Sequence, residues 1–460
     1  MQNKTIAQLC VMVFLLAGFL SIEAQVPGMP FMSLKEIIRK NVFGGTGSDG
    51  GYCIIQTTDG GYAIAGITNS NDGDVSGNHG GSDMWVVKFN ATGSIEWKKT
   101  FGGTGYDGAY SIIQTSDDGY AIAGSIYVSN AYGNMFVAKL SASGSLEWQK
   151  SLGGTDNDGA NSIIQTSDGG YAVAGFTYST DAGFSEPAGS WDGSSYGSDI
   201  YIVKLNSAGT VEWSRHYGGS GNDAASSIIQ ATDGDYVVAG VSQSGSYTGY
   251  YYNNYNSGNH GGGDMWVIKL KSSGGVEWER TLGGTVNDEA NSIIRTADGG
   301  YIVAGGAASN DGDVSGNHGN RDAWVIKLSN LGIIQWQKLL GGSINDLANS
   351  IIQTADGGYA AAGFTFSNDG DVSGNHGGGD MWVVKLNTAG TIQWQKALGG
   401  TGFDRAQSII RTSNGGYAIV GVTDSIDGNI IGPNNGSSDV FLLRLDAAGN
   451  FIRVYEDAPE

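Results

Sequence analysis

The sequence predicts an all-β protein built from seven similar units, and three observations lead to this expectation. One stretch of text, best represented by Leu340–Ala397, is written seven times between Phe43 and the C-terminus. The chain has Gly 78 but only Pro 5, with 22 Tyr, 14 Phe and 11 Trp, which is typical of short aromatic strands joined by tight turns. Each copy also divides into four short strand-like runs. We therefore expect a seven-bladed β-propeller of four-stranded antiparallel blades.

The copies follow one another at intervals of 51 to 65 residues, obtained by subtracting their first positions. They start at Phe43, Phe101, Leu152, Tyr217, Leu282, Leu340 and Leu398. The shortest interval shows that about 50 residues suffice for one unit, which matches the length of a propeller blade.

The four runs can be recognised within the representative copy. They are Ser350–Thr354, Tyr359–Thr365, Met381–Leu386 and Thr391–Lys396. The last run alternates apolar and polar residues, as a half-buried strand does, whereas the third is apolar on both sides. Asp-Gly-Gly and Asn-Thr-Ala-Gly turns separate the runs and supply the positive φ values that hairpins need.

A ring is favoured over an open solenoid, because a solenoid needs atypical capping repeats and the end copies here stay close to the consensus. Both Ile37–Phe43 and Phe451–Tyr455 resemble a fourth strand, with Arg39 and Arg453 in place of its Trp. We expect the C-terminal segment to close the last blade and Ile37–Phe43 to lie beside it or to cap the ring. The domain assignment is then a signal peptide at 1–24, a lead-in with a candidate extra outer strand at 25–42, the propeller at 43–455 and a tail at 456–460.

The N-terminus indicates export. Lys4, the apolar run Cys10–Leu20 and the small residue Ala24 are typical of a secretory signal, and no later run reaches membrane length. We expect a monomer that is secreted or held at the cell surface, with the periplasm as a second location. Cys53 would be the one cysteine of the mature chain, so no intramolecular disulfide could form.

The charge narrows the choice of partners. The net charge is −21 and the sequence pI is about 4.4. A nucleic-acid binder needs a basic surface that displaces counterions, so nucleic acid is excluded as a partner. Cations, neutral sugars and basic proteins remain open, and the acidity also keeps a secreted protein soluble.

Every crossover between copies contains Gly-Gly-Thr/Ser-x-x-Asp or a close variant. Its aspartates are Asp49, Asp107, Asp158, Asp223, Asp288, Asp346 and Asp404. If the first strand is innermost, these carboxylates encircle the mouth of the central channel. They either lock each turn by accepting backbone N–H groups, which we favour because the residue recurs in all copies, or gather around a cation.

A second acidic motif lies between the second and third runs, on the same face as the crossovers. Copies one, five and six read Ser-Asn-Asp-Gly-Asp-Val-Ser-Gly-Asn-His-Gly at 70–80, 309–319 and 367–377. Oxygen ligands spaced two apart resemble the start of a calcium loop, although the distal Glu is missing. Calcium is thus a candidate cofactor, with Asp72, Asp74, Asp311, Asp313, Asp369 and Asp371 as ligands. The alternative is Asx-turn chemistry, and we interpret His79, His260, His318 and His376 as turn residues.

Copies three and four depart from the repeat in this same connection. Copy three carries Phe184, Trp191 and Tyr196, and copy four carries Tyr247, Tyr250, Tyr251, Tyr252 and Tyr255. Aromatic side chains interleaved with Asn, Ser and Gly are suited to stacking on sugar rings or docking on a protein, or they bury one another. We take Trp191, Tyr196 and the five tyrosines as the candidate ligand-binding residues of a non-catalytic binding or scaffold module.

The alternative function is a polysaccharide-degrading enzyme, a glycosidase or lyase. It would need an asymmetric pair of carboxylic acids. Glu186 and Asp192 are the candidates, because they have no equivalent in the other copies. The Gly-Gly-Thr-Gly element is not a nucleotide loop, since it opens no helix and lacks Gly-Lys-Ser/Thr.

The third and fourth runs carry a family resemblance over about residues 43–455. Leu140–Trp148 resembles the Gly-x-x-x-Trp ending of quinoprotein-type blades, and Asp-Gly-Gly-Tyr with Asp-x-Trp-x-x-Lys-Leu is similar to secreted bacterial propellers of the delta-60-like type. The resemblance implies an exported propeller in which one Trp per blade docks onto the next. The tryptophans at this position are Trp97, Trp148, Trp213, Trp278, Trp336 and Trp394. The quinone and calcium ligands of quinoprotein dehydrogenases have no counterpart in this chain.

Overall fold

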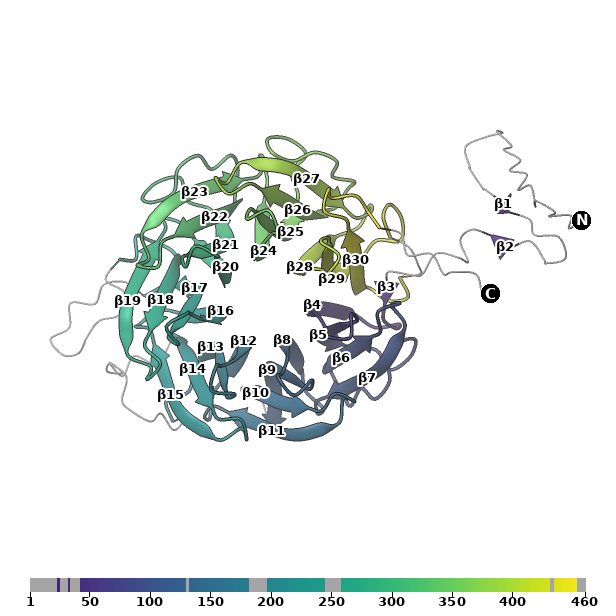
Figure 1. The fold of residues 1–460 in the computed structure, drawn as a ribbon, viewed down its shortest axis with the longest axis horizontal. Helices are drawn as coiled ribbons and strands as arrows, with labels where there is room; N and C mark the ends of the chain where they lie inside the picture. The colour runs from purple at the N-terminus through teal and green to yellow at the C-terminus, as the bar shows by residue number, and fades with distance from the viewer. Residues whose placement is uncertain are drawn as a thin grey trace, which may run out of the picture.

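The structure is a computed structural model that describes residues 23–24, 32–33, 42–129, 132–181, 197–244, 258–430 and 434–452. The predicted architecture is confirmed. Seven four-stranded antiparallel sheets form a ring, with the first strand of each sheet innermost and the fourth outermost (Figure 1). None of the described segments forms a helix long and apolar enough to cross a membrane.

The strands of each blade follow one another in the chain. Blade 1 consists of β4 (Asp49–Gln56), β5 (Tyr62–Thr68), β6 (Asp83–Phe89) and β7 (Ile95–Phe101). Blade 2 consists of β8 (Gly108–Gln114), β9 (Tyr120–Ser129), β10 (Tyr132–Leu140) and β11 (Leu146–Leu152). Blade 3 consists of β12 (Asp158–Gln165), β13 (Tyr171–Thr177), β14 (Asp199–Leu205) and β15 (Val211–Tyr217). Blade 4 consists of β16 (Asp223–Gln230), β17 (Tyr236–Ser242), β18 (Asp264–Leu270) and β19 (Val276–Leu282).

The remaining blades have the same order. Blade 5 consists of β20 (Asp288–Arg295), β21 (Tyr301–Ala307), β22 (Asp322–Leu328) and β23 (Ile334–Leu340). Blade 6 consists of β24 (Asp346–Gln353), β25 (Tyr359–Thr365), β26 (Asp380–Leu386) and β27 (Ile392–Leu398). Blade 7 consists of β28 (Asp404–Arg411), β29 (Tyr417–Thr423), β30 (Asp439–Leu445) and β3 (Val42–Phe43). A separate short pair is formed by β1 (Glu23–Ala24) and β2 (Met32–Ser33).

The hydrophobic core lies between the blades. Each of seven clusters combines side chains from two neighbouring blades, and the seventh joins blade 7 to blade 1. In the cluster between blades 5 and 6, for example, Val325 packs with Ile351 and Trp382. A blade therefore buries both of its faces only when it has a neighbour on each side, which is the physical reason for a closed ring.

The predicted docking of the fourth-strand tryptophans is also confirmed. Trp336 of blade 5 lies against Tyr359 of blade 6, with ring centroids 5.8 Å apart. It also lies under the turn of blade 6 at Gly390, which has φ +78° and where a Cβ would stand 2.8 Å from the indole ring. This turn therefore needs glycine for two reasons, its left-handed backbone and the close approach of the tryptophan.

Blade 7 differs from the expected closure, because both ends of the chain contribute to its outer position. Val42 and Phe43 of β3 pair with Phe441 and Val440 of β30. At the other end of β30, Phe451 forms an antiparallel bridge with Leu445. The expectation that the C-terminal segment alone fills this position is wrong. The two segments divide it: Phe43 belongs to the core cluster of blades 7 and 1, and Phe451 packs against the cluster of blades 6 and 7, while each pairs with the backbone of β30.

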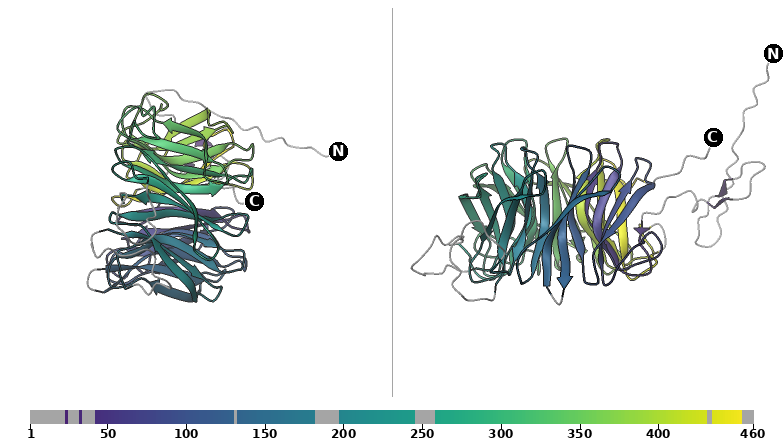
Figure 2. Two further views of the ribbon diagram at one scale, coloured as in Figure 1. Left: turned by 90° about the vertical axis from the view of Figure 1, so that its left-hand side faces the viewer. Right: turned by 90° about the horizontal axis from the view of Figure 1, so that it is seen from below.

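The two faces of the disc carry different connections (Figure 2). The turns after first and third strands are all five residues long, as at 57–61 and 90–94. The connections after second strands range from two residues, 130–131, to 21 residues, 178–198 and 243–263. We call the side with these variable connections and the blade crossovers the loop face.

Candidate functional site

The crossover aspartates are internal residues of the loop face. Each of the seven is at most 2% exposed. In blade 6 the N–H of Gly342 donates to Asp346 Oδ2 at 2.7 Å, and Ser367 Oγ donates to the same oxygen at 2.8 Å. The other six accept the equivalent backbone N–H at 2.7–3.0 Å. Their interpretation as residues that lock the turn between blades is confirmed.

The six aspartates with calcium-loop spacing also accept hydrogen bonds from residues of the crossover turns. Asp311 accepts the N–H of Thr285 at 2.8 Å and its hydroxyl at 2.9 Å, and Asp313 accepts the N–H of Gly283 at 3.4 Å. Asp72 and Asp74 make the same contacts in blade 1. Asp369 and Asp371 accept the corresponding N–H groups in blade 6. This is the turn chemistry considered as the alternative to calcium, and the calcium assignment of these residues stays a prediction.

The histidines of this connection anchor the third strand. His318 Nδ1 lies 2.6 Å from Asp322 Oδ2, and the backbone N–H of His318 donates to the same oxygen at 2.9 Å. His79, His260 and His376 make the same pair of contacts. Their aspartate partners are fully buried and were not predicted as site residues. In the sequence, each of these aspartates is the first residue of an Asp-x-Trp-x-x-Lys-Leu run or a close variant, and this recurrence could have indicated them.

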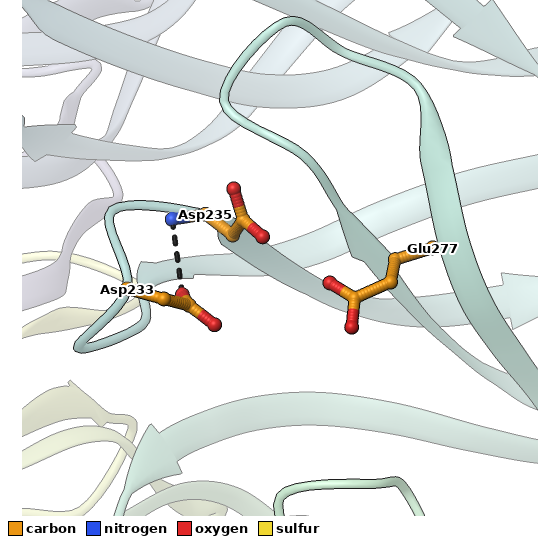
Figure 3. Close-up of side chains that lie close together, drawn as sticks. All are labelled: Asp233, Asp235 and Glu277. Carbon is orange, nitrogen blue, oxygen red and sulfur yellow. Dashed lines mark hydrogen bonds between the residues drawn. The ribbon is translucent and has the colours of Figure 1, made fainter.

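One cluster of three acidic groups in the described part of the chain has oxygens close enough to share a metal ion. It consists of Asp233, Asp235 and Glu277 in blade 4 (Figure 3). The ammonium of the buried Lys269 already lies among these oxygens, 2.6 Å from Asp233, 3.0 Å from Glu277 and 3.9 Å from Asp235. Burial alone would lower the pKa of Lys269, but hydrogen bonds to Asp233 and Glu277 outweigh it and raise that pKa.

This lysine cluster recurs around the ring on the face opposite the loop face. Lys88, Lys139 and Lys204 each pair with an Asp of the first turn and a Glu of the fourth strand. In blades 5 and 6, Lys327 and Lys385 keep the Asp partner. Because the cluster repeats with a lysine at its centre, its ion pairs connect the first turn of each of these blades to the third strand, and the ammonium occupies the space between the acidic oxygens.

The aromatic and acidic candidates of copies three and four stay predictions. Trp191, Tyr196, Tyr247, Tyr250, Tyr251, Tyr252 and Tyr255 lie outside the described residues, as do Glu186 and Asp192. The described part of the loop face does present apolar side chains to solvent. They are Tyr106, Tyr132, Tyr178, Val286, Ile344 and Ile426, with exposed fractions of 38% to 75%.

Comparison with known proteins gives one relative in sequence. No protein-family model matches the chain. The regulatory protein FlaEY of Caulobacter vibrioides is 26% identical over 228 residues, which cover 45% of this chain. The match spans 22% of the length of that curated relative.

Similar solved structures are β-rich chains of low sequence identity. The Pan2 WD40 domain of Neurospora crassa has a TM-score of 0.47 at 11% identity, covering 88% of this chain and 91% of that domain. BamB of Moraxella catarrhalis has a TM-score of 0.37 at 13% identity, covering 95% of this chain and 99% of BamB. A puromycin hydrolase has a TM-score of 0.48 at 10% identity, covering 92% of this chain and 57% of the hydrolase. We carry over no activity from any of them.

Proposed function

We propose that this protein is an exported, non-catalytic propeller scaffold that binds a glycan or an extracellular protein through its loop face. The observation that carries the proposal is the difference between the two faces. All turns of one face have the same length, whereas the connections of the loop face vary from two to 21 residues. A constant scaffold with variation confined to one set of loops is the usual arrangement of a binding protein.

The chemistry of the loop face supports a neutral or basic partner. Its described part presents apolar side chains such as Tyr106 and Ile344 and also exposed carboxylates such as Asp311 and Asp369. Aromatic and aliphatic groups contribute contact area to a sugar ring or a protein surface. Negative charge disfavours acidic polymers and favours basic proteins.

The longest connections should contain the main contacts. Residues 178–198 and 243–263 belong to adjacent blades and carry the candidate aromatic residues. Two neighbouring long loops can form one continuous binding surface. The equivalent short loops of the other blades present only small surfaces that repeat from blade to blade. We therefore place the binding residues in blades 3 and 4.

The test is a glycan array together with polysaccharide binding and hydrolysis assays on the mature protein. Binding without turnover is expected, and changing Tyr250, Tyr251 and Tyr252 to Ser should weaken it at least tenfold. The matched control is Leu331→Ser with Ile333→Ser, because these side chains are each 57% exposed on the opposite face. Their replacement should leave binding unchanged.

The same assays separate the enzymatic alternative from the scaffold. Turnover of a polysaccharide that Glu186→Gln and Asp192→Asn both abolish would contradict the proposal. Secretion is tested by expressing the full chain in a bacterial host and sequencing the N-terminus of the exported product, which should begin at Gln25. A product that keeps its N-terminal segment inside the cell would contradict export.

A further inference from the structure

Apolar side chains follow one another across the loop face from the junction of blades 5 and 6 to blade 7. Ile344 lies in the crossover that enters blade 6 and is 43% exposed, and Ile426 lies in the connection after β29 and is 75% exposed. Three partly exposed phenylalanines, Phe364, Phe366 and Phe403, belong to the segments between them. We call these five residues the apolar strip.

Backbone contacts bring the first two members of the strip together. The N–H of Ile344 donates to Ser367 Oγ at 3.0 Å. The N–H of Phe366 donates to the carbonyl oxygen of Asn345 at 2.9 Å. The crossover into blade 6 and the end of β25 therefore lie side by side, although 22 residues separate Ile344 from Phe366 by subtraction of their positions.

The three phenylalanines form the centre of the strip. The rings of Phe366 and Phe403 are stacked, with centroids 5.5 Å apart and an interplanar angle of 11°. Phe364 meets both rings edge-on, at 5.6 and 5.8 Å. A Cβ at Gly379 would stand 2.8 Å from Phe366 Cε1 and 3.1 Å from Phe403 Cδ2, so both rings lie against the backbone of this glycine. The rings hold one another in place before any partner arrives, which lowers the entropic cost of binding.

The far end of the strip is reached through blade 7. The N–H of Asp424 donates to the carbonyl oxygen of Phe403 at 2.9 Å. The N–H of Gly402 donates to Ser425 Oγ at 2.9 Å, and Ile426 is the next residue. The strip is thus continuous over two crossovers and three blades.

The scaffold itself does not require apolar residues at these positions. Most other copies have polar residues where this part of the chain has Phe366, Phe403 and Ile426. They are Asn69, Gln243 and Asp424, then Ser48, Asn157, Asn222, Asn287 and Asn345, and finally Asn71, Thr180, Asn310 and Asn368. Because those blades have the same strands, the strip adds nothing to the blade fold, and a contiguous exposed apolar surface marks an interaction site.

Exposed carboxylates accompany the strip. Asp369 accepts the N–H of Ser343, the residue before Ile344, at 2.8 Å. Asp427 accepts the N–H of Thr401 at 2.7 Å and its hydroxyl at 3.0 Å. Asp424 is also exposed, and none of the three forms an ion pair with a described lysine or arginine. The hydrogen bonds from Ser343 lower the pKa of Asp369, so its carboxylate is charged at neutral pH.

The shape of the strip favours a protein over a sugar. Stacking on a sugar ring needs an open aromatic face, whereas Phe366 and Phe403 turn their faces towards each other. The two ends of the strip are isoleucines, which pack best against other aliphatic side chains. The surrounding negative charge then selects a partner segment that carries positive charge.

We propose that the apolar strip docks a basic protein segment whose aliphatic side chains cover Ile344, the phenylalanine rings and Ile426. Lysine or arginine side chains of that segment would meet Asp369, Asp424 and Asp427. The apolar contacts supply most of the affinity, and the carboxylates orient the partner and speed its approach. This surface is separate from the binding residues placed in blades 3 and 4, and it does not depend on them.

The experiment measures binding of a fluorescent peptide of alternating lysine and leucine to the full chain by fluorescence anisotropy. Ile344→Ser combined with Ile426→Ser should weaken binding by about tenfold, and Phe366→Ser should act in the same direction. Both isoleucines are exposed, so the double variant should keep its fold, which circular dichroism checks. Asp424→Asn and added salt should each weaken binding as well, and a peptide of alternating glutamate and leucine should not bind.

The matched control is Leu331→Ser with Ile333→Ser, two aliphatic side chains of similar exposure on the opposite face, which should leave peptide binding unchanged. The variant with Tyr250, Tyr251 and Tyr252 changed to Ser should also keep it, which separates this surface from the glycan test above. An equal loss of affinity in the Leu331 and Ile333 control would overturn the proposal, as would full binding by the Ile344 and Ile426 variant or no binding of the peptide at all. Binding of an oligosaccharide that the Ile344 and Ile426 variant abolishes would assign the strip to a glycan instead.

Discussion

At the scale of the residue, the buried charges of this protein differ in whether an opposite charge meets them. The lysine of each third strand in blades 1 to 6 has a carboxylate of the first turn within 3 Å. The crossover aspartates accept hydrogen bonds, and no lysine or arginine of the described residues forms an ion pair with them. The contributions of the two kinds of carboxylate to the free energy of unfolding should therefore change in opposite directions with pH.

Asp223 provides a test at pH values above 4. Burial, with a smaller contribution from Asp199, raises its pKa to about 6 despite hydrogen bonds from Ser242 and Ser244. Because the folded pKa exceeds the unfolded one, this group stabilises the fold below about pH 4 and that stability is lost as the pH rises towards 6. The free energy of unfolding should fall by up to about 3 kcal/mol over this range. Urea unfolding of Asp223→Asn should lack this decline.

Asp356 is the matched control with the opposite sign. Hydrogen bonds from Thr354 and Lys385 lower its pKa to about 2. Its contribution is present above the unfolded pKa and is lost as the pH falls from about 4 towards 2. Asp356→Asn should therefore change how the free energy of unfolding depends on pH below about pH 4 and leave its dependence between about pH 4 and 6 unchanged. Identical profiles for Asp223→Asn and the unchanged protein would contradict the assignment of Asp223.

At the scale of the element, the fourth strands of blades 1 to 6 each contact the next blade through a tryptophan. The indole–tyrosine contact recurs at six junctions with centroid separations of 5.4–6.2 Å. A fourth strand has a sheet partner on one side only, so side-chain packing decides how firmly its blade is held.

Trp336→Ala should lower the free energy of unfolding by about 3 kcal/mol, since it removes a large side chain from the interface of blades 5 and 6. Chemical denaturation followed by circular dichroism measures this change. The control is Gln335→Ala on the same strand, where the side chain is exposed and the expected change is within about 0.5 kcal/mol. Equal effects of the two substitutions would contradict the docking role of the tryptophan.

At the scale of the whole molecule, the two ends of the chain close the ring together. Phe43 of β3 is 8% exposed and packs edge-on against Phe89 of blade 1, with ring centroids 5.0 Å apart. Phe451 contacts the core cluster of blades 6 and 7 from a half-buried position. The N-terminal contact thus joins the last blade to the first, whereas the C-terminal one packs between the last blade and blade 6.

Phe43→Ala should therefore cost about 3 kcal/mol of stability, and Phe451→Ala should cost less. Thermal unfolding monitored at two wavelengths would also show whether the ring still melts in one transition. If Phe451→Ala proved the more destabilising change, the C-terminal segment would be the main closing strand.

The sequence alone predicts the scaffold well, because its signals are local and repeated seven times. The runs of each copy, the glycine of each turn and the tryptophan of the fourth strand in six copies can all be predicted from spacing. It predicts the candidate site less well. The lysine clusters and the apolar strip join residues from separate segments, and periodicity along the chain carries no information about which of them meet.

The sequence by itself determined the number of blades, their strand order and the loop face on which the copies differ, since strand period and turn chemistry depend on near neighbours. Only the tertiary structure decided that Val42–Phe43 and Phe451 share the outer position of blade 7. It alone also stacked Phe366 on Phe403, from two separate segments of the chain. These outcomes depend on the closure of the ring, which brings together residues whose contacts exist only when each blade has a neighbour on both sides.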